Sequence, residues 1–335
     1  MDVMKTRLML RRRPLAALPV LAALSASLPV SRAFAAPNRQ QNWSQIRMLF
    51  LIWSFESNAF FAPMVNGVKD AEKDQGISVD IKYGNEDLTR MNDIIETAIA
   101  SGTKGIATTI PNDTGLNAVL DGARKKQLPV IAFNIDNSKG AAGGSYRLAY
   151  VGQNFIVAGN SIGEFMIAHF HIGKGDLVFT PVEAPAAVYA VQRHAGVANA
   201  LAKVGARTEI LGTGNDHARA LSLMTQYLIG HSDTKAIIGL GETPTSQAVA
   251  AIKEAGLKIP AAGFDVDSEI VRNIEAGSLA ATVDQQPYIQ GYYTVTEMAL
   301  LLKFGVTPSD IDTGGRSLIT KANAGFAAKW AGITR

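Results

Sequence analysis

Two polar residues stand where short apolar segments end, and their side chains could bind a small ligand. Asn134 supplies an amide and Asp265 a carboxylate. In open parallel sheets, ligands bind beyond the carboxyl ends of the strands, where polar groups can meet them. Capping of the following helix is the alternative role. Asn137 and Asp267 are better placed for capping, so we assign Asn134 and Asp265 to a binding cleft.

An internal repeat relates these two positions. Residues 103–106, 128–130 and 133–136 recur as residues 234–237, 259–261 and 264–267, always with an offset of 131 residues. A constant offset that keeps Pro and Phe in step indicates two similar structural units rather than chance similarity. Asn134 and Asp265 should therefore occupy equivalent strand ends on opposite walls of one cleft.

The elements that position these residues alternate along the chain. The apolar, β-type segments are 46–53, 77–83, 104–110, 128–134, 175–180, 207–211, 235–240, 259–264 and 279–283, and the helical segments lie near 60–74, 88–101, 114–126, 155–171, 188–203, 216–230, 243–256, 267–276 and 287–304. Alternating strands and helices predict parallel sheets covered on both faces. The expected fold class is α/β, with two similar Rossmann-like parallel-sheet domains.

Aromatic residues follow the first apolar segment. Asn58 is followed closely by Phe60 and Phe61. One Phe could serve as a hydrophobic staple of the next helix. Two adjacent rings beyond a strand end instead suggest a stacking wall for sugar rings, whose C–H faces are apolar, with about 0.5–1.5 kcal/mol per contact.

Other motifs give no support for catalysis, a metal or a cofactor. The G-x-S-x-G pattern at 159–163 lies inside a helical segment, whereas a nucleophile needs a sharp strand-to-helix turn. The five histidines lack metal-ligand spacing. Gly212-Thr213-Gly214 has no third glycine of the dinucleotide fingerprint. We therefore expect no catalytic residue, metal or cofactor.

The N-terminus has the pattern of an export signal. Basic residues precede the apolar stretch 15–30, and Ala33-Phe34-Ala35 forms a small-x-small cleavage site. We predict a signal peptide at 1–35 and a periplasmic location. Arg12-Arg13 also suits a twin-arginine signal, so the export route stays open.

The charge balance changes once this segment is removed. Residues 1–35 hold six basic residues and one acidic residue, so removal leaves 26 basic and 28 acidic residues and a net charge of −2. A chain with this charge balance lacks the excess of basic residues that is typical of nucleic-acid-binding proteins. The sequence also has no Cys, which excludes disulfides and thiolate metal sites.

At residues 58–61, 128–134, 263–265 and 277–285 the sequence resembles the type I periplasmic sugar-binding proteins, the ribose-binding-like receptors of ABC importers. The resemblance covers about residues 46–320. It implies a polar contact from Asn58, a stacking pair from Phe60 and Phe61, and ligand contacts from Asp265, Gln285 and Arg193.

The resemblance also implies a domain organisation. The chain would cross between two lobes near Gln153, Gln285 and Thr313. The N-terminal lobe would comprise 46–153 and 286–313, and the C-terminal lobe 154–285 and 314–331.

Three departures from the ribose-receptor pattern affect the expected ligand. Ribose receptors have Asp-Arg where this chain has Asn134-Ile135, an aromatic residue at Asn215, and an Asn at Gly241. Glu242, Tyr189 or Asp136 could replace the missing groups. The implied ligand is another pentose, a furanose, a branched sugar or a polyol rather than ribose.

The resemblance implies a monomeric receptor that closes on a small neutral sugar or polyol and delivers it to an inner-membrane ABC permease. One alternative is a periplasmic sensor that feeds a membrane kinase or chemoreceptor. Another is an exported sugar-processing enzyme, which would need a carboxylate pair such as Glu242 and Asp265.

Overall fold

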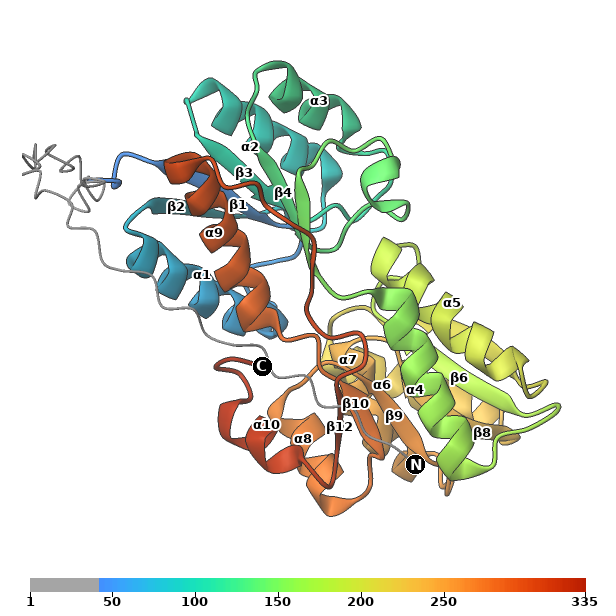
Figure 1. Cartoon of the computed structure of the whole chain (residues 1–335). Coiled ribbons are helices and arrows are strands. Elements are labelled where there is room, and N and C mark those ends of the chain that lie inside the picture. Colours follow the sequence, from blue (N-terminus) through green and yellow to red (C-terminus); the bar gives the residue numbers. More distant parts are fainter. Residues whose placement is uncertain (1–41) are drawn as a thin grey trace, which may run out of the picture. The chain divides into compact units, whose positions relative to one another are not determined.

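The computed structural model describes residues 42–335, which form one compact unit. The predicted signal peptide at 1–35 lies outside the described residues. Within this unit, the chain builds two six-stranded sheets. In Figure 1, strands β1–β4 belong to one half, together with the red-orange helix α9, and strands β6–β10 belong to the other.

The first half is built on the sheet β11-β5-β4-β3-β1-β2, in which all paired strands are parallel. Its strands are β1 (Arg47–Ile52), β2 (Ser78–Tyr83), β3 (Gly105–Thr108), β4 (Val130–Asn134), β5 (Ala149–Gly152) and β11 (Ile311–Asp312), and its helices are η1 (Ala59–Phe61), α1 (Ala62–Gln75), α2 (Leu88–Ala100), α3 (Asn117–Lys125), η2 (Gly140–Ala142) and α9 (Pro287–Phe304). Separate apolar cores cover its two faces, one with α1 and α9 and the other with α2 and α3.

The second half is built on the sheet β12-β10-β9-β8-β6-β7, in which only β12 is antiparallel. Its strands are β6 (Leu177–Val182), β7 (Arg207–Gly212), β8 (Thr234–Gly239), β9 (Ala261–Phe264), β10 (Ala281–Val283) and β12 (Leu318–Thr320), and its helices are α4 (Phe155–Phe170), α5 (Val188–Ala202), α6 (His217–Gly230), α7 (Glu242–Glu254), α8 (Ser268–Ala276) and α10 (Ala324–Trp330). Helices α4 and α5 cover one face, and α6, α7, α8 and α10 cover the other.

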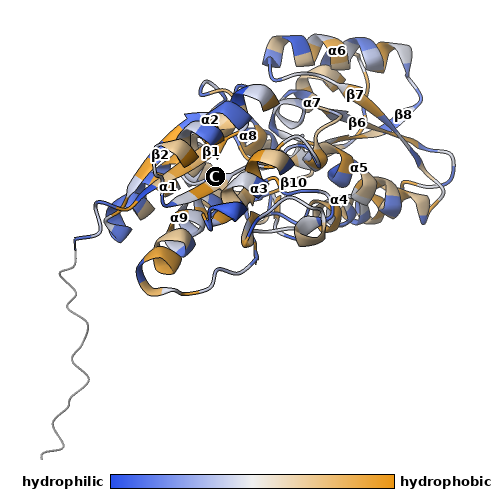
Figure 2. Ribbon diagram, turned by 90° about the horizontal axis from the view of Figure 1, so that it is seen from above, coloured by the Kyte–Doolittle hydropathy of each residue, from blue (hydrophilic) through white to orange (hydrophobic). Residues whose placement is uncertain are grey.

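The predicted fold class is confirmed, because both halves are α/β and share one order of strands. The central strands are buried along their whole length, as strands covered on both faces must be. Figure 2 shows the corresponding hydrophobic colours on strands and mixed colours along the helices.

All nine predicted strands and nine predicted helices are present, within a few residues of their expected bounds. Strands β5, β11 and β12 and helix α10 were not predicted. They have only two to seven residues each, which is too short for a hydrophobic period to emerge.

The chain passes between the sheets three times: after β5, after β10 and after β11. Each of these connections begins at the carboxyl end of a strand, which is the edge of the sheet where ligands bind in this class of fold. Among residues 42–335, no helix has both the length and the apolar character needed to cross a bilayer.

The G-x-S-x-G pattern lies within α4, as expected. The Ser161 hydroxyl donates to the Val157 carbonyl in the preceding turn. A Cβ at Gly159 would approach the Arg193 carbonyl oxygen to 2.3 Å, so the glycine permits close packing of α4 on α5. The small residues thus position α5, which carries Arg193.

Candidate ligand-binding site

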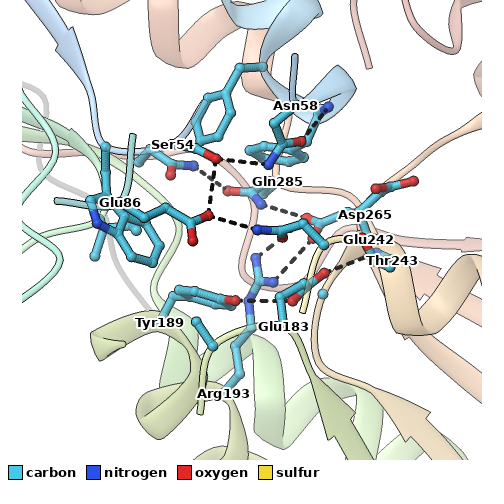
Figure 3. A pocket seen from close by; sticks show the side chains of 18 of the residues that line it. Ser54, Asn58, Glu86, Glu183, Tyr189, Arg193, Glu242, Thr243, Asp265 and Gln285 are labelled. Atoms are coloured by element: carbon cyan, nitrogen blue, oxygen red, sulfur yellow. Dashed lines mark hydrogen bonds and ion pairs between the residues drawn. The ribbon is translucent and has the colours of Figure 1, made fainter. Parts of the chain in front are cut away.

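One cavity collects ten of the residues that the sequence singled out for ligand binding (Figure 3). These are Asn58, Phe60, Phe61, Asn134, Tyr189, Arg193, Asn215, Glu242, Asp265 and Gln285. The wall also contains Trp53, Ser54, Glu86, Ile135, Phe155, Glu183, Ala184, Gly241 and Thr243. Both halves contribute, so the cavity lies between the carboxyl edges of the two sheets.

Asn134 and Asp265 occupy equivalent positions, as the repeat predicted. Asn134 ends β4 and Asp265 follows β9, and the two strands hold the same place in the sheet order. Their φ angles are 60° and 71°, in the left-handed region. Asn and Asp tolerate this region better than most residues, because their short polar side chains bond locally. Each half therefore uses the same sharp turn to direct a polar side chain into the site.

Arg193 is the buried cation of the site, with 2% of its side chain exposed. Its Nη1 donates to Asp265 Oδ2 at 3.2 Å and to the Leu240 carbonyl at 2.8 Å. Its Nη2 donates to Gln153 Oε1 at 3.2 Å. The guanidinium also lies over the Phe264 ring, 4.3 Å from the centroid. The charged pair is thus fixed before any ligand arrives.

Gln285 connects the two strand ends. Asn134 Nδ2 donates to Gln285 Oε1 at 3.0 Å, and Gln285 Nε2 donates to Asp265 Oδ1 at 2.5 Å. The same Asn134 amide nitrogen donates to Gln290 Oε1 at 3.0 Å. This continuous network links the segment after β10, which carries Gln285, to polar side chains on both walls of the cavity.

The second half supplies two further carboxyl groups. Glu183 accepts from the Thr243 backbone N–H at 2.9 Å and from the Tyr189 hydroxyl at 3.0 Å. Its enclosure in the wall raises its pKa. Burial, followed by the neighbouring Asp267 carboxylate, raises the pKa of Glu242 to about 10. In its protonated form Glu242 can donate a hydrogen bond to a ligand.

The first half supplies rings, amides and one carboxylate. Asn58 caps η1, because its Oδ1 accepts from the Phe60 N–H at 3.1 Å. Phe60 and Phe61 meet edge to face with centroids 4.8 Å apart. Glu86 Oε1 accepts from Asn215 Nδ2 at 2.7 Å, which is a direct bond between the two halves.

Glu86 and Glu183 were not predicted. Glu183 directly follows β6 and Glu86 closely follows β2, so the reasoning applied to Asn134 and Asp265 could have found both. Two suggestions were wrong. Asp136 lies outside this cavity and pairs with the buried Arg147 at 2.7 Å. Asn137 caps no helix and accepts from the Lys139 N–H in a loop, whereas Asp267 does cap α8.

The pairing of similar sheets around one polar cavity has a counterpart among known proteins. Residues 49–305 match the model of a family described as periplasmic binding protein domain. The chain belongs to this family. The xylose/arabinose-binding protein XylF of Sulfolobus acidocaldarius is 28% identical over 80% of this chain and 69% of its own length. The D-apiose import binding protein of Paraburkholderia graminis is 25% identical over 83% of this chain and 88% of its own.

Solved structures share the fold of this periplasmic binding protein. A carbohydrate transporter from Acidothermus cellulolyticus, in complex with myo-inositol, superimposes with a TM-score of 0.77 at 24% identity, covering 86% of this chain and 99% of its own. A solute-binding protein from Burkholderia graminis, in complex with D-arabinose, gives 0.76 at 24% identity, covering 84% and 97%. At this level of identity, these neighbours support the architecture.

Proposed function

We propose that this periplasmic binding protein is the receptor of an ABC importer for a small neutral sugar or polyol. The observation that carries the proposal is the composition of the cavity wall. Aromatic rings from the first half face carboxyl groups and a guanidinium from the second half. Sugar rings and polyols offer apolar C–H faces and many hydroxyls, which suit such walls.

The hydroxyl groups of the ligand would be divided between the walls. Asp265 and Glu183 accept hydrogen bonds, and Arg193 and protonated Glu242 can donate them. Phe60 and Phe61 would stack on the ring. The departures at Asn134, Asn215 and Gly241 favour another pentose, a furanose, a branched sugar or a polyol over ribose, and the names of the relatives, which bind xylose, arabinose and apiose, agree with this class.

Closure of two lobes would trap the ligand. We assign 46–153 with 286–313 to one lobe and 154–285 with 314–331 to the other, with the three crossings as hinges. Hydrogen bonds that join the halves in this structure, such as Gln192 Nε2 to the Ser138 carbonyl at 3.0 Å, would stabilise the closed form. A ligand that touches both walls binds the closed form more tightly and shifts the population toward it.

The remaining assignments follow from this function. The protein would be exported by the signal at 1–35, act in the periplasm as a monomer, and present its closed form to a membrane permease. It would bind its ligand without converting it, as expected for relatives that are named as binding proteins.

Thermal unfolding with a panel of pentoses, hexoses, furanoses and polyols tests the proposal. The protein is first unfolded and refolded to remove any carried-over ligand. A ligand at 1,000 times its Kd stabilises the fold by about 4.1 kcal/mol and raises Tm by several degrees. A shift with one or two neutral compounds, recovered unchanged, supports the receptor. No shift with any compound would contradict it.

A further inference from the structure

A second cavity adjoins the ligand-binding cavity. Its volume is about 240 Å³, compared with about 70 Å³ for the first. Phe60, Glu242, Asp265 and Gln285 line both cavities, so the two cavities meet at these four side chains. A ligand held by Asp265 therefore lies directly beside further unfilled space.

The C-terminal segment Ala331–Arg335 forms the outer wall of this second cavity. The segment follows α10 and reaches the first half, where Asn66 Nδ2 of α1 donates to the Ile333 carbonyl at 3.1 Å (Figure 1). The Arg335 guanidinium pairs with the carboxylate of Asp284, whose side chain is only 2% exposed. Since a buried carboxylate needs its partner, this pair anchors the segment over the cavity.

The lining has two chemical faces. Ala59, Pro63 and Pro287 give an apolar face on the side of the first half. Asp267 and Ser268 give polar groups on the side of the second half. The first cavity likewise has an apolar face opposite oxygen acceptors. This combination suits a group that has C–H surface on one side and hydroxyls on the other.

We propose that the second cavity receives a substituent attached to the bound ring, namely a glycosidic alkyl group or a second sugar unit. The C-terminal segment sets the size limit of that substituent. This inference rests on the proposed function, because it requires a sugar in the first cavity. The ligands of the protein would then include glycosides and short oligosaccharides in addition to free monosaccharides.

Calorimetric titration of the full chain tests the assignment. The probes are D-xylose, L-arabinose, D-ribose, D-allose and D-galactose, the methyl glycoside of each, and xylobiose. We expect at least one glycoside or xylobiose to bind at least as tightly as its parent sugar. Ser268→Phe and Ala331→Leu, which fill the second cavity from two sides, should weaken that binding at least tenfold and change parent-sugar affinity less than twofold.

Ser222→Phe on the exposed surface of α6 is the matched control and should change neither affinity. Binding of free sugars with exclusion of every glycoside and of xylobiose would overturn the second-cavity assignment and leave the proposed function intact. Equal weakening of parent and glycoside by both filling variants, or no weakening of either, would also overturn it. Failure of every probe to bind would overturn the second-cavity assignment, whereas the proposed function is decided by the wider panel of the thermal-unfolding test.

Discussion

The two halves of the molecule share a scaffold and differ in the chemistry they bring to the cavity. Each half places its polar residue at the end of the equivalent strand with a left-handed turn, at Asn134 in one and Asp265 in the other. Around that position the first half has a single carboxylate, Glu86, beside its rings and amides, whereas the second half adds several carboxyl groups and Arg193 to its own rings and amides. The backbone of a repeated unit can therefore stay constant while its strand-end side chains diverge.

The largest expected effect comes from removing the carboxylate that pairs with Arg193. Asp265→Ala leaves Arg193 buried without its carboxylate, and breaking a buried pair costs about 3–5 kcal/mol. We expect a lower Tm and at least a hundredfold loss of ligand affinity, measured by thermal unfolding and calorimetry. Asp121→Ala, which removes two exposed ion pairs on α3, is the control and should change neither. Unchanged affinity in Asp265→Ala would remove this residue from the site.

Giving the first half the same strand-end residue type as the second half tests whether the difference between Asn134 and Asp265 matters. Asn134→Asp removes the amide donor to Gln285 and Gln290 and adds a carboxylate beside their oxygens. Buried groups that lose a partner cost about 1–3 kcal/mol, so the urea midpoint should fall by a corresponding amount. Asn112→Asp, at an exposed position where the side-chain oxygen accepts from the Thr114 and Gly115 N–H groups, is the control. A stability equal to that of the native chain would mean that the two strand ends are interchangeable.

The carboxyl groups of the second half make stability depend on pH. The pKa of Glu242 is raised to about 10 from its ordinary 4.5, so the folded state holds a proton that the unfolded state releases. Its contribution to stability is greatest below pH 4.5 and declines as the pH rises toward 10. Relative to the native chain, Glu242→Gln should therefore gain stability with rising pH, by more than about 1.4 kcal/mol between pH 5 and 8, the value of one pKa unit.

Urea unfolding of both proteins across this range measures the difference. Subtracting the native curve removes the contribution of Asp284, whose pKa is also raised by burial. The charge of Glu183 raises the pKa of Glu242, so the difference reports these two carboxyl groups together. A constant difference between the two proteins at all pH values would show that Glu242 ionises normally in the folded state.

The smallest expected effect concerns the bond that joins the halves at the exposed rim. Glu86 accepts from Asn215 at 2.7 Å, and hydrogen bonds of this kind contribute about 0.5–1.5 kcal/mol. Glu86→Ala and Asn215→Ala should each weaken ligand binding about threefold, because the closed form loses one bond. The double variant should be no weaker than either single variant, as a double-mutant cycle would reveal. Additive losses would mean that the two residues act separately.

Much of the fold was accessible from the sequence because it depends on local patterns. Strands buried on both faces are recognisable as short apolar segments, and helices covered on one face keep a 3.6-residue period. The repeat at a constant offset then made the two halves equivalent and paired Asn134 with Asp265. Short edge strands such as β11 and β12 were missed, because only neighbouring strands define them.

The candidate site, like the fold, could be predicted only in part from the sequence. The residues that directly follow a strand, or that match a known family pattern, were predicted, and their gathering in one cavity depended only on the order of strands. Glu86, Glu183 and the second cavity behind Phe60 were not predicted. Their positions depend on how the two sheets face each other and on where the C-terminal segment packs.

The sequence by itself therefore determined the class of fold, the duplication and the strand ends that bear polar groups, since hydrophobic period and repeat spacing are properties of neighbouring residues. Only the tertiary structure decided which carboxyl groups share a wall, which of them have raised pKa values, and how far the cavity extends. Those properties depend on burial and on distances between residues far apart in the chain, such as Asp284 and Arg335, and no local pattern records them.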